Sequence, residues 1–281
     1  MKGFHIMQQS QYKSNSELKY LARMQTGRYM GILAGTILLN FVITLVAANI
    51  FSSLVPVTTA VGYIINYILV FAVQVVTSVL NVGLSFIFLK SACNMQSTIS
   101  DLFCGFRKNT SKALKLSAII AVVESICMIP LDIASVQLTD VLESVNLNDL
   151  SLMLAGGSLD SYEILESYNV FYNAMMKFYL IMLVCTVISV ILTLPFFPAF
   201  YMILDFPSWS AGTILKKSFE IMSGNKLRLF MLYLSFLPLY LLSIFTCGIA
   251  LIWVIPYMKM AETNFYLDMM AVRNKTINSC V

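Results

Sequence analysis

Three ionisable side chains in two of the apolar stretches of this sequence are the first candidates for chemistry. Glu124 lies near the middle of one such stretch, Asp132 near its far end, and Lys177 at the start of the next. An ionised and unpaired carboxylate inside a lipid bilayer is costly, so Glu124 is a candidate for proton transfer. Asp132 and Lys177 are expected at a similar depth, where opposite charges can form an ion pair.

Side-chain amides and hydroxyls form a second set of candidates, in the apolar stretch 61–90. The set is Asn66, Gln74, Ser78, Asn81 and Ser85. Their spacing places them on one face of a helix. In lipid such groups need polar partners, so this face is expected to turn toward other helices or a wet cavity. Two interpretations stay open: hydrogen bonds between helices, or the lining of a substrate path.

The sequence lacks the residue patterns that enzymes and metal sites require. Its single histidine is His5, and its six cysteines form no C-x-x-C pair that would indicate a zinc site. It contains no G-x-S-x-G, H-E-x-x-H or phosphate-binding glycine motif. Glu124 and Asp132 would lie about 12 Å apart along one helix, too far for a catalytic carboxylate pair. We therefore expect no enzymatic activity, no metal and no cofactor.

Composition and hydropathy place the chain in a membrane. Of its 281 residues, 59% are hydrophobic and 11% are charged, whereas soluble domains are about 25% charged. Several apolar stretches reach the roughly 20 residues that cross a bilayer. We therefore predict an all-α integral membrane protein, with one polytopic domain over residues 1–281. The expected transmembrane helices are 29–51, 61–90, 116–136, 176–204, 227–245 and 249–270.

The distribution of charge predicts which loops face the cytoplasm. The 18 Lys and Arg residues gather mainly in short clusters, as the positive-inside rule requires of cytoplasmic loops, rather than on one surface that would bind nucleic acid. Residues 1–28 are basic, whereas 137–175 contain acidic residues and no Lys or Arg, and are expected outside. The run 229–257 is either one span or a hairpin that turns at 246–248. The positive-inside rule favours the hairpin, which keeps both termini in the cytoplasm and gives six spans.

A short pattern occurs three times, each time ahead of two apolar stretches. At 21–33, 102–116 and 218–230 a predicted amphipathic helix is followed by a glycine, basic residues and an apolar run. We predict elbow helices on the inner membrane surface, the last of them at 208–224, each leading into a hairpin of two spans. The basic residues expected to contact lipid phosphates are Arg28, Arg107, Lys108, Lys226 and Arg228.

Glycine and proline residues predict two local features of the spans. Gly31 and Gly35 form a G-x-x-x-G pair in the first span, which lets another helix approach closely. Pro195 and Pro198 are expected to kink the inner half of the fourth span, because proline removes helix hydrogen bonds.

Motifs in the last third of the chain resemble those of a known family. They read LPFFPAFYMILDFP, KKSFEIMSGNKLRLF, LSFLPLYLLSIFTCGIALIWVIPY and NFY, and LFCGFR at 102–107 matches the same layout. They are similar to the uncharacterised bacterial membrane family DUF975. The sequence departs from that family at Phe197-Pro198, where Pro-Gly is usual, and in its longer acidic segment.

This resemblance implies a multipass protein of the bacterial cell membrane whose activity is unknown. The family is similar in turn to the membrane domain that accompanies some glycerophosphodiester phosphodiesterases. No catalytic residue carries over from the family, since none is assigned in it.

Two functions are consistent with these features. The first is a non-enzymatic membrane scaffold or accessory factor, favoured by the repeated hairpins and the lack of chemistry. The alternative is a small transporter, exporter or permease subunit, in which Glu124 and the polar face of 61–90 line the path. The expected partners are the anionic inner leaflet, an unidentified membrane or extracytoplasmic protein, and a second copy of the chain. Nucleic acid is not expected.

Overall fold

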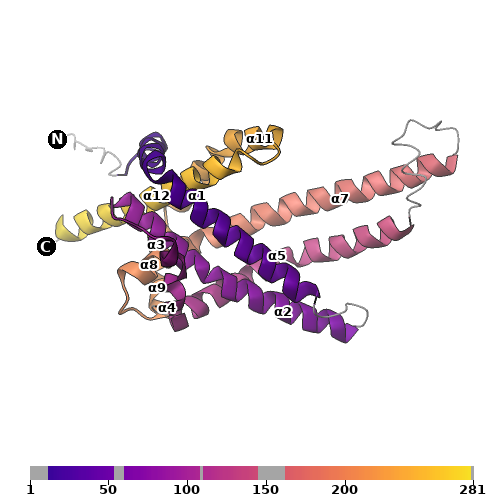
Figure 1. Cartoon of the computed structure of the whole chain (residues 1–281), viewed down its shortest axis with the longest axis horizontal. Helices are drawn as coiled ribbons and strands as arrows, with labels where there is room; N and C mark the ends of the chain where they lie inside the picture. The colour runs from indigo at the N-terminus through magenta and orange to yellow at the C-terminus, as the bar shows by residue number, and fades with distance from the viewer. Residues whose placement is uncertain (1–11, 54–59, 108–109, 145–161, 280–281) are drawn as a thin grey trace, which may run out of the picture. The chain divides into compact units, whose positions relative to one another are not determined.

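The computed structural model of the protein describes residues 12–53, 60–107, 110–144 and 162–279 (Figure 1). Within these ranges the chain forms helices joined by turns and contains no strand. The all-α prediction is therefore confirmed. Helices suit a chain that crosses lipid, because every backbone N–H and C=O can then be bonded within its own segment.

Helix α1 (Asn15–Ser53) combines the basic N-terminal stretch with the first predicted span. Its first turn is capped reciprocally. The Glu17 N–H donates to the Ser14 hydroxyl at 3.2 Å, and the Ser14 N–H donates to the Glu17 carboxylate at 2.7 Å. At Tyr29 the backbone leaves the helical region (φ −114°, ψ 17°), so α1 kinks where the predicted basic segment meets the predicted span.

The second predicted span consists of two helices, α2 (Ala60–Ser78) and α3 (Leu80–Ala92), with a break at Val79. After α3 the chain forms the 3₁₀ turn η1 (Ile99–Phe103) and the short helix α4 (Cys104–Arg107). Both of these elements fold back against α3.

Two glycines let η1 and α4 approach the second span at backbone distance. A Cβ atom on Gly83 would lie 1.7 Å from the carbonyl oxygen of Leu102. One on Gly105 would lie 2.7 Å from the carbonyl oxygen of Val79. The LFCGFR motif can therefore pack this closely on α3 because positions 83 and 105 carry no side chain. By contrast, Cβ atoms on the G-x-x-x-G pair of α1 would meet nothing within 4 Å, so no described helix packs closely on that pair.

The third and fourth predicted spans fall on α5 (Thr110–Ser144) and α7 (Tyr162–Thr193), which are both longer than predicted. Helix α7 gives way to the 3₁₀ turn η2 (Leu194–Phe196) and then to the short helix α8 (Ala199–Asp205). The break contains the prolines at positions 195 and 198, as the sequence predicts. The middle of the predicted acidic segment lies outside the described residues.

The last third of the chain forms four helices separated by turns. They are α9 (Ala211–Met222), α10 (Lys226–Leu234), α11 (Leu237–Phe245) and α12 (Leu251–Ser279). Gly224 (φ 86°) turns the chain between α9 and α10. Cys247 (φ 49°) and Gly248 (φ 84°) turn it between α11 and α12. The apolar run 229–257 is thus broken at the residues where a hairpin would turn.

The described helices fall into two compact units. Residues 122–193 form the smaller unit, and the rest of the described chain forms the larger one. In the larger unit α12 packs along α1 and also contacts α3, while α3 contacts α8 (Figure 1). Leu18 of α1 and Phe265 and Met269 of α12 are buried in its core. Helix α12 is therefore the element around which the larger unit is assembled.

Five helical stretches of the described chain are long and apolar enough to cross a membrane. They are Asn15–Ile50, Ile64–Ala92, Thr110–Glu143, Tyr168–Asp205 and Lys226–Phe245. The predicted sixth span, 249–270, falls on α12 and is not among them. Helix α12 carries several charged residues, and its residues 260–266 are buried within the protein.

Candidate functional site

Helix α12 carries a run of polar side chains in the interior of the larger unit. Its sequence from 262 to 268 is ETNFYLD. The polar members are Glu262, Thr263, Asn264, Tyr266 and Asp268, and each is at most 7% exposed. Burying a polar group costs free energy unless it is hydrogen bonded, so the partners of these five side chains define the site.

Asp268 forms an ion pair with Arg228 that also holds the segment before α1. The Arg228 guanidinium binds the Asp268 carboxylate, and the two side chains are 18% and 5% exposed. The Lys13 N–H donates to the carboxylate oxygens at 3.3 and 3.2 Å, and the Lys13 carbonyl accepts from Arg228 at 2.7 Å. The guanidinium also lies over the rings of Tyr12 and Phe265, 4.7 and 4.6 Å from their centroids. One ion pair thus joins α10, α12 and the start of the described chain.

Tyr266 and Thr263 connect α12 to α8. The Tyr266 hydroxyl donates to the Asp205 carboxylate at 2.6 Å. The ring of Tyr266 stacks on that of Tyr201, with centroids 4.7 Å apart, and the hydroxyls of Tyr201 and Thr263 are 3.1 Å apart. These contacts fix the short helix that follows the proline break.

Asn264 connects α12 to α1 and, through α1, to α3. Its side-chain amide donates to the side-chain oxygen Oε1 of Gln25 at 2.7 Å. The Gln25 amide in turn donates to the backbone carbonyl of Ala92 at 3.1 Å. Ala92 ends α3, where backbone carbonyls lack partners within the helix. Two consecutive hydrogen bonds therefore link three helices.

Glu262 is a buried carboxylate whose charged partner reaches the surface. The Lys259 ammonium lies 2.9 Å from the carboxylate, and the two side chains are 44% and 3% exposed. Such a group can hold or pass a proton, since it joins a carboxylate to an ammonium. In the part of the chain that the structure describes, no cluster of three or more His, Cys, Asp or Glu could hold a metal ion.

The predicted polar face of the second span is not a single inward face in the structure. Asn66 and Gln74 on α2 are half-buried, whereas Asn81 on α3 is exposed. The break at Val79 separates them, so Asn81 departs from the prediction. The Oδ1 atom of Asn66 is buried without a hydrogen-bond partner among the described residues, while Gln74 does interact with its surroundings.

The three ionisable candidates all belong to the smaller unit. Glu124 on α5 is half-buried and interacts with its surroundings. Asp132 and Lys177 are exposed, and the ion pairs of the described ranges do not include one between them. The expected pairing of these two residues is therefore not seen among the described residues. Lys177 instead lines a cavity of about 580 Å³, together with Gln137 of α5 and Asn173 of α7.

The basic residues predicted to contact lipid phosphates lie in different environments. Those that are exposed are Arg28, Arg107 and Lys226. Lys108 lies outside the described residues. Arg228 requires a correction, because its guanidinium is paired with Asp268 inside the protein and is not free to hold a lipid phosphate.

The helix predicted at 208–224 corresponds to α9, which packs on the protein through one side. The Ser218 hydroxyl donates to the Pro195 carbonyl at 2.6 Å, and the Phe219 ring meets that of Phe196 edge-on, with centroids 5.0 Å apart. Lys216 lies on the exposed side. These contacts join α9 to the proline break before α8.

The three copies of the elbow pattern do not share one geometry. The glycine turns the chain through a positive φ only in the last copy, at Gly224. Gly27 lies inside α1, and Gly105 lies inside α4. The likeness between the three stretches is therefore one of sequence pattern, and the turn itself is specific to the third.

The ion pair between Lys90 and Asp101 makes a testable contribution to stability. Asp101 accepts hydrogen bonds from the Lys90 ammonium at 2.8 Å and from the Thr98 N–H at 2.9 Å. Burial raises the pKa of Asp101, but the Lys90 ammonium and the Thr98 N–H outweigh it and lower the pKa below its ordinary value. A carboxylate of lowered pKa stabilises the fold above its unfolded pKa of about 4, and that contribution is lost as the pH falls.

We therefore expect Asp101→Asn to cost about 1 kcal/mol at pH 7. Its melting temperature should approach that of the wild type as the pH falls below about 4. Thermal unfolding in detergent from pH 3 to pH 8 measures this, with the exposed residue Asp140 as the site of a matched Asp→Asn control. A difference between Asp101→Asn and wild type that stays constant with pH would contradict the assignment.

The polar network on α12 is not predicted from the sequence. The signal that could reveal it is the density of polar residues in ETNFYLD inside a predicted span, where each needs a partner. The partners themselves cannot be read from local spacing, because they come from distant positions. Lys13 and Asp268, for example, are 255 residues apart.

Comparison with known proteins identifies a family for the chain but no individual relative. No curated protein and no solved structure matches the chain. A similarity to the membrane domain of glycerophosphodiester phosphodiesterases is therefore not shown. The sequence model of one family, described as "Protein of unknown function (DUF975)", matches residues 7–273. Because this match covers nearly the whole chain, the protein belongs to the DUF975 family.

Proposed function

We propose that the protein is a non-enzymatic scaffold or accessory factor of the bacterial cell membrane. The observation that carries this proposal is the pairing of every polar side chain between Glu262 and Asp268 with a described partner. Where no water competes for the polar groups, hydrogen bonds between helices hold the helices in one arrangement. Polar groups used in this way support a rigid framework rather than a path for a substrate.

The scaffold role implies a stable partner, which is either another membrane or extracytoplasmic protein or a second copy of the chain. Affinity purification after cross-linking in native membranes tests this. We expect a partner present in fixed ratio to the tagged chain, absent when an unrelated multipass protein carries the same tag. A chain that is recovered monomeric and alone would contradict the scaffold role.

We further propose six spans with both termini in the cytoplasm, and two exposed cysteines allow a direct test. Cys93 follows α3, and Cys247 lies in the turn between α11 and α12. The six-span topology places Cys93 inside the cell and Cys247 outside. In single-cysteine variants, a membrane-impermeant maleimide should label Cys247 in intact cells and Cys93 only after permeabilisation. The reverse pattern, or protection of Cys247 under both conditions, would contradict six spans.

A transporter is the second candidate, favoured by the Oδ1 atom of Asn66. This atom is buried without a hydrogen-bond partner among the described residues. An amide oxygen in a candidate membrane span requires a donor, which a water-filled path or a polar substrate would supply. Under this hypothesis Glu124 contributes a carboxyl group that carries a proton.

Replacement of Glu124 with Gln separates the two candidates. Gln keeps the shape of the side chain but cannot bind and release a proton at neutral pH. If the protein is a scaffold, membrane level and partner recovery should stay within about twofold of wild type, because Gln keeps the size of the side chain and can still form hydrogen bonds. If it is a proton-coupled transporter, a loss-of-function phenotype should appear at unchanged protein level. Complementation of a deletion strain, with immunoblotting of the membrane fraction, measures both.

A further inference from the structure

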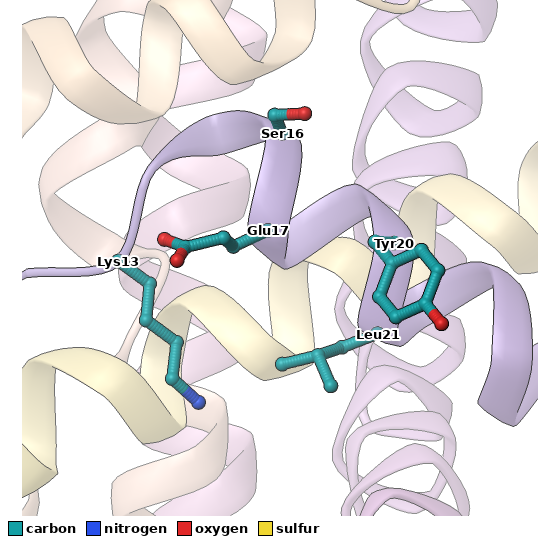
Figure 2. Close-up of a pocket in the computed structure, with 5 residues that line it drawn as sticks. All are labelled: Lys13, Ser16, Glu17, Tyr20 and Leu21. Carbon is teal, nitrogen blue, oxygen red and sulfur yellow. The ribbon is translucent and has the colours of Figure 1, made fainter.

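Lys13 stands between two cavities at the start of α1. The first has a volume of about 470 Å³ and is lined by Lys13, Ser16, Glu17, Tyr20 and Leu21 (Figure 2). The second has a volume of about 520 Å³ and lies between the same segment and the start of α10. It is lined by Tyr12, Lys13, Ser14, Asn15, Gly224, Leu227, Arg228 and Met231, with no carboxylate among them, and Arg228 is the residue paired with Asp268. The second cavity is therefore the better candidate for binding an anion.

Lys13 is exposed and lines both cavities, and its side chain makes no hydrogen bond in the described part of the chain. The hydrogen bonds of Lys13 to Asp268 and Arg228 use only its backbone N–H and carbonyl. Glu17 is engaged by Ser14, whose N–H and hydroxyl donate to its carboxylate at 2.7 and 3.0 Å. Figure 2 shows the Lys13 side chain extending away from that carboxylate. None of the ion pairs in the described ranges includes Lys13.

The α10 side of the same cavity carries two apolar side chains beside Arg228, whose guanidinium is paired with Asp268. Leu227 and Met231 are one turn apart on α10, and both side chains are exposed. They belong to the first turns of the candidate membrane span Lys226–Phe245. The cavity therefore offers a cation at one side and an apolar ridge at the other, at the point where a span would enter the bilayer.

We propose that this cavity binds one anionic phospholipid. The Lys13 ammonium would bind the phosphate, while Leu227 and Met231 would contact the glycerol and the first acyl carbons. Free phosphate could bind the Lys13 ammonium in the same way, but it has no apolar part to contact Leu227 and Met231. The site does not depend on the scaffold role, because lipid binding at Lys13 requires only that α10 enters the membrane.

Native mass spectrometry of the purified full chain, titrated with phosphatidylglycerol or phosphatidylcholine, tests the proposal. We expect the wild type to retain phosphatidylglycerol more tightly than phosphatidylcholine. Lys13→Ala should weaken retention of phosphatidylglycerol about tenfold, the effect of losing one hydrogen bond to a charged group. Lys216→Ala, which removes the same charge from the exposed side of α9, should change it by less than about twofold. Lys13→Ala should melt like the wild type, since the backbone makes the structural contacts of this residue.

Two further arms identify the ligand. Leu227→Gln should weaken phosphatidylglycerol retention, and inorganic phosphate at millimolar concentration should not displace the lipid. If Lys13→Ala and Lys216→Ala have equal effects, or if the two lipids bind equally, the site is overturned. If phosphate displaces the lipid and Leu227→Gln has no effect, the cavity binds free phosphate and the assignment to a lipid is overturned.

Discussion

Replacing Arg228 with Ala is expected to lower the free energy of unfolding by about 3–5 kcal/mol. The substitution leaves the Asp268 carboxylate, 5% exposed, without its cation. It also removes the donor to the Lys13 carbonyl and the cation between two aromatic rings. The Lys13 N–H alone cannot replace the hydration that Asp268 loses on burial. Unfolding of the purified protein by dodecyl sulfate in mixed micelles, followed by circular dichroism, measures the loss.

The ion pair between Lys217 and Glu220 provides the matched control. Its two residues lie one turn apart on α9, with a distance of 2.8 Å, and Glu220 is 50% exposed and also pairs with Arg273. Lys217→Ala should therefore cost at most about 1 kcal/mol. The double variant Arg228→Met/Asp268→Leu should recover much of the loss, because it buries neither charge. Equal costs for Arg228→Ala and Lys217→Ala would show that the buried pair does not hold the fold together.

The same residue shows what the sequence can and cannot predict. The basic character of Lys226 and Arg228, next to an apolar run, correctly predicts where α10 begins. The pairing of Arg228 with Asp268 cannot be read from the sequence, because the two residues are 40 positions apart, with helix α11 and two turns between them. Charge clusters indicate which side of a membrane a loop occupies, but they do not identify which cation has a buried partner.

Breaks in the helices can be predicted from the sequence where a proline or glycine lies at the break, but not elsewhere. The prolines at positions 195 and 198, and the glycine at 248, lie where the chain leaves a helix. The break at Val79 has no such residue, and the Val79 carbonyl there lies close to Gly105 of α4, a contact that the local sequence does not predict. This break separates Asn81 from the half-buried amides of α2. A single-face prediction fails there because helical periodicity assumes an uninterrupted helix.

Gly83→Ala is expected to destabilise the larger unit by about 3 kcal/mol or more, because overpacking against a backbone cannot be relieved by rotating a side chain. The added Cβ atom would lie 1.7 Å from the carbonyl oxygen of Leu102, 2.3 Å from its carbonyl carbon and 2.8 Å from its Cα. Turn η1 would have to move away from α3, which would disturb the ion pair between Lys90 and Asp101. Unfolding in mixed micelles measures the loss, and the pH dependence assigned to Asp101 should weaken with it.

Gly31→Ala is the control that separates this contact from the general cost of changing a glycine in a helix. A Cβ atom on Gly31 would meet nothing within 4 Å, and Ala favours a helix over Gly by about 1 kcal/mol. Gly31→Ala should therefore leave the free energy of unfolding unchanged or raise it slightly. If both substitutions were tolerated equally, η1 would not be held against α3 at backbone distance. If Gly83→Ala alone is damaging, the glycine in the second span is explained by the turn that packs on it, and the G-x-x-x-G pair of α1 has no such role within the chain.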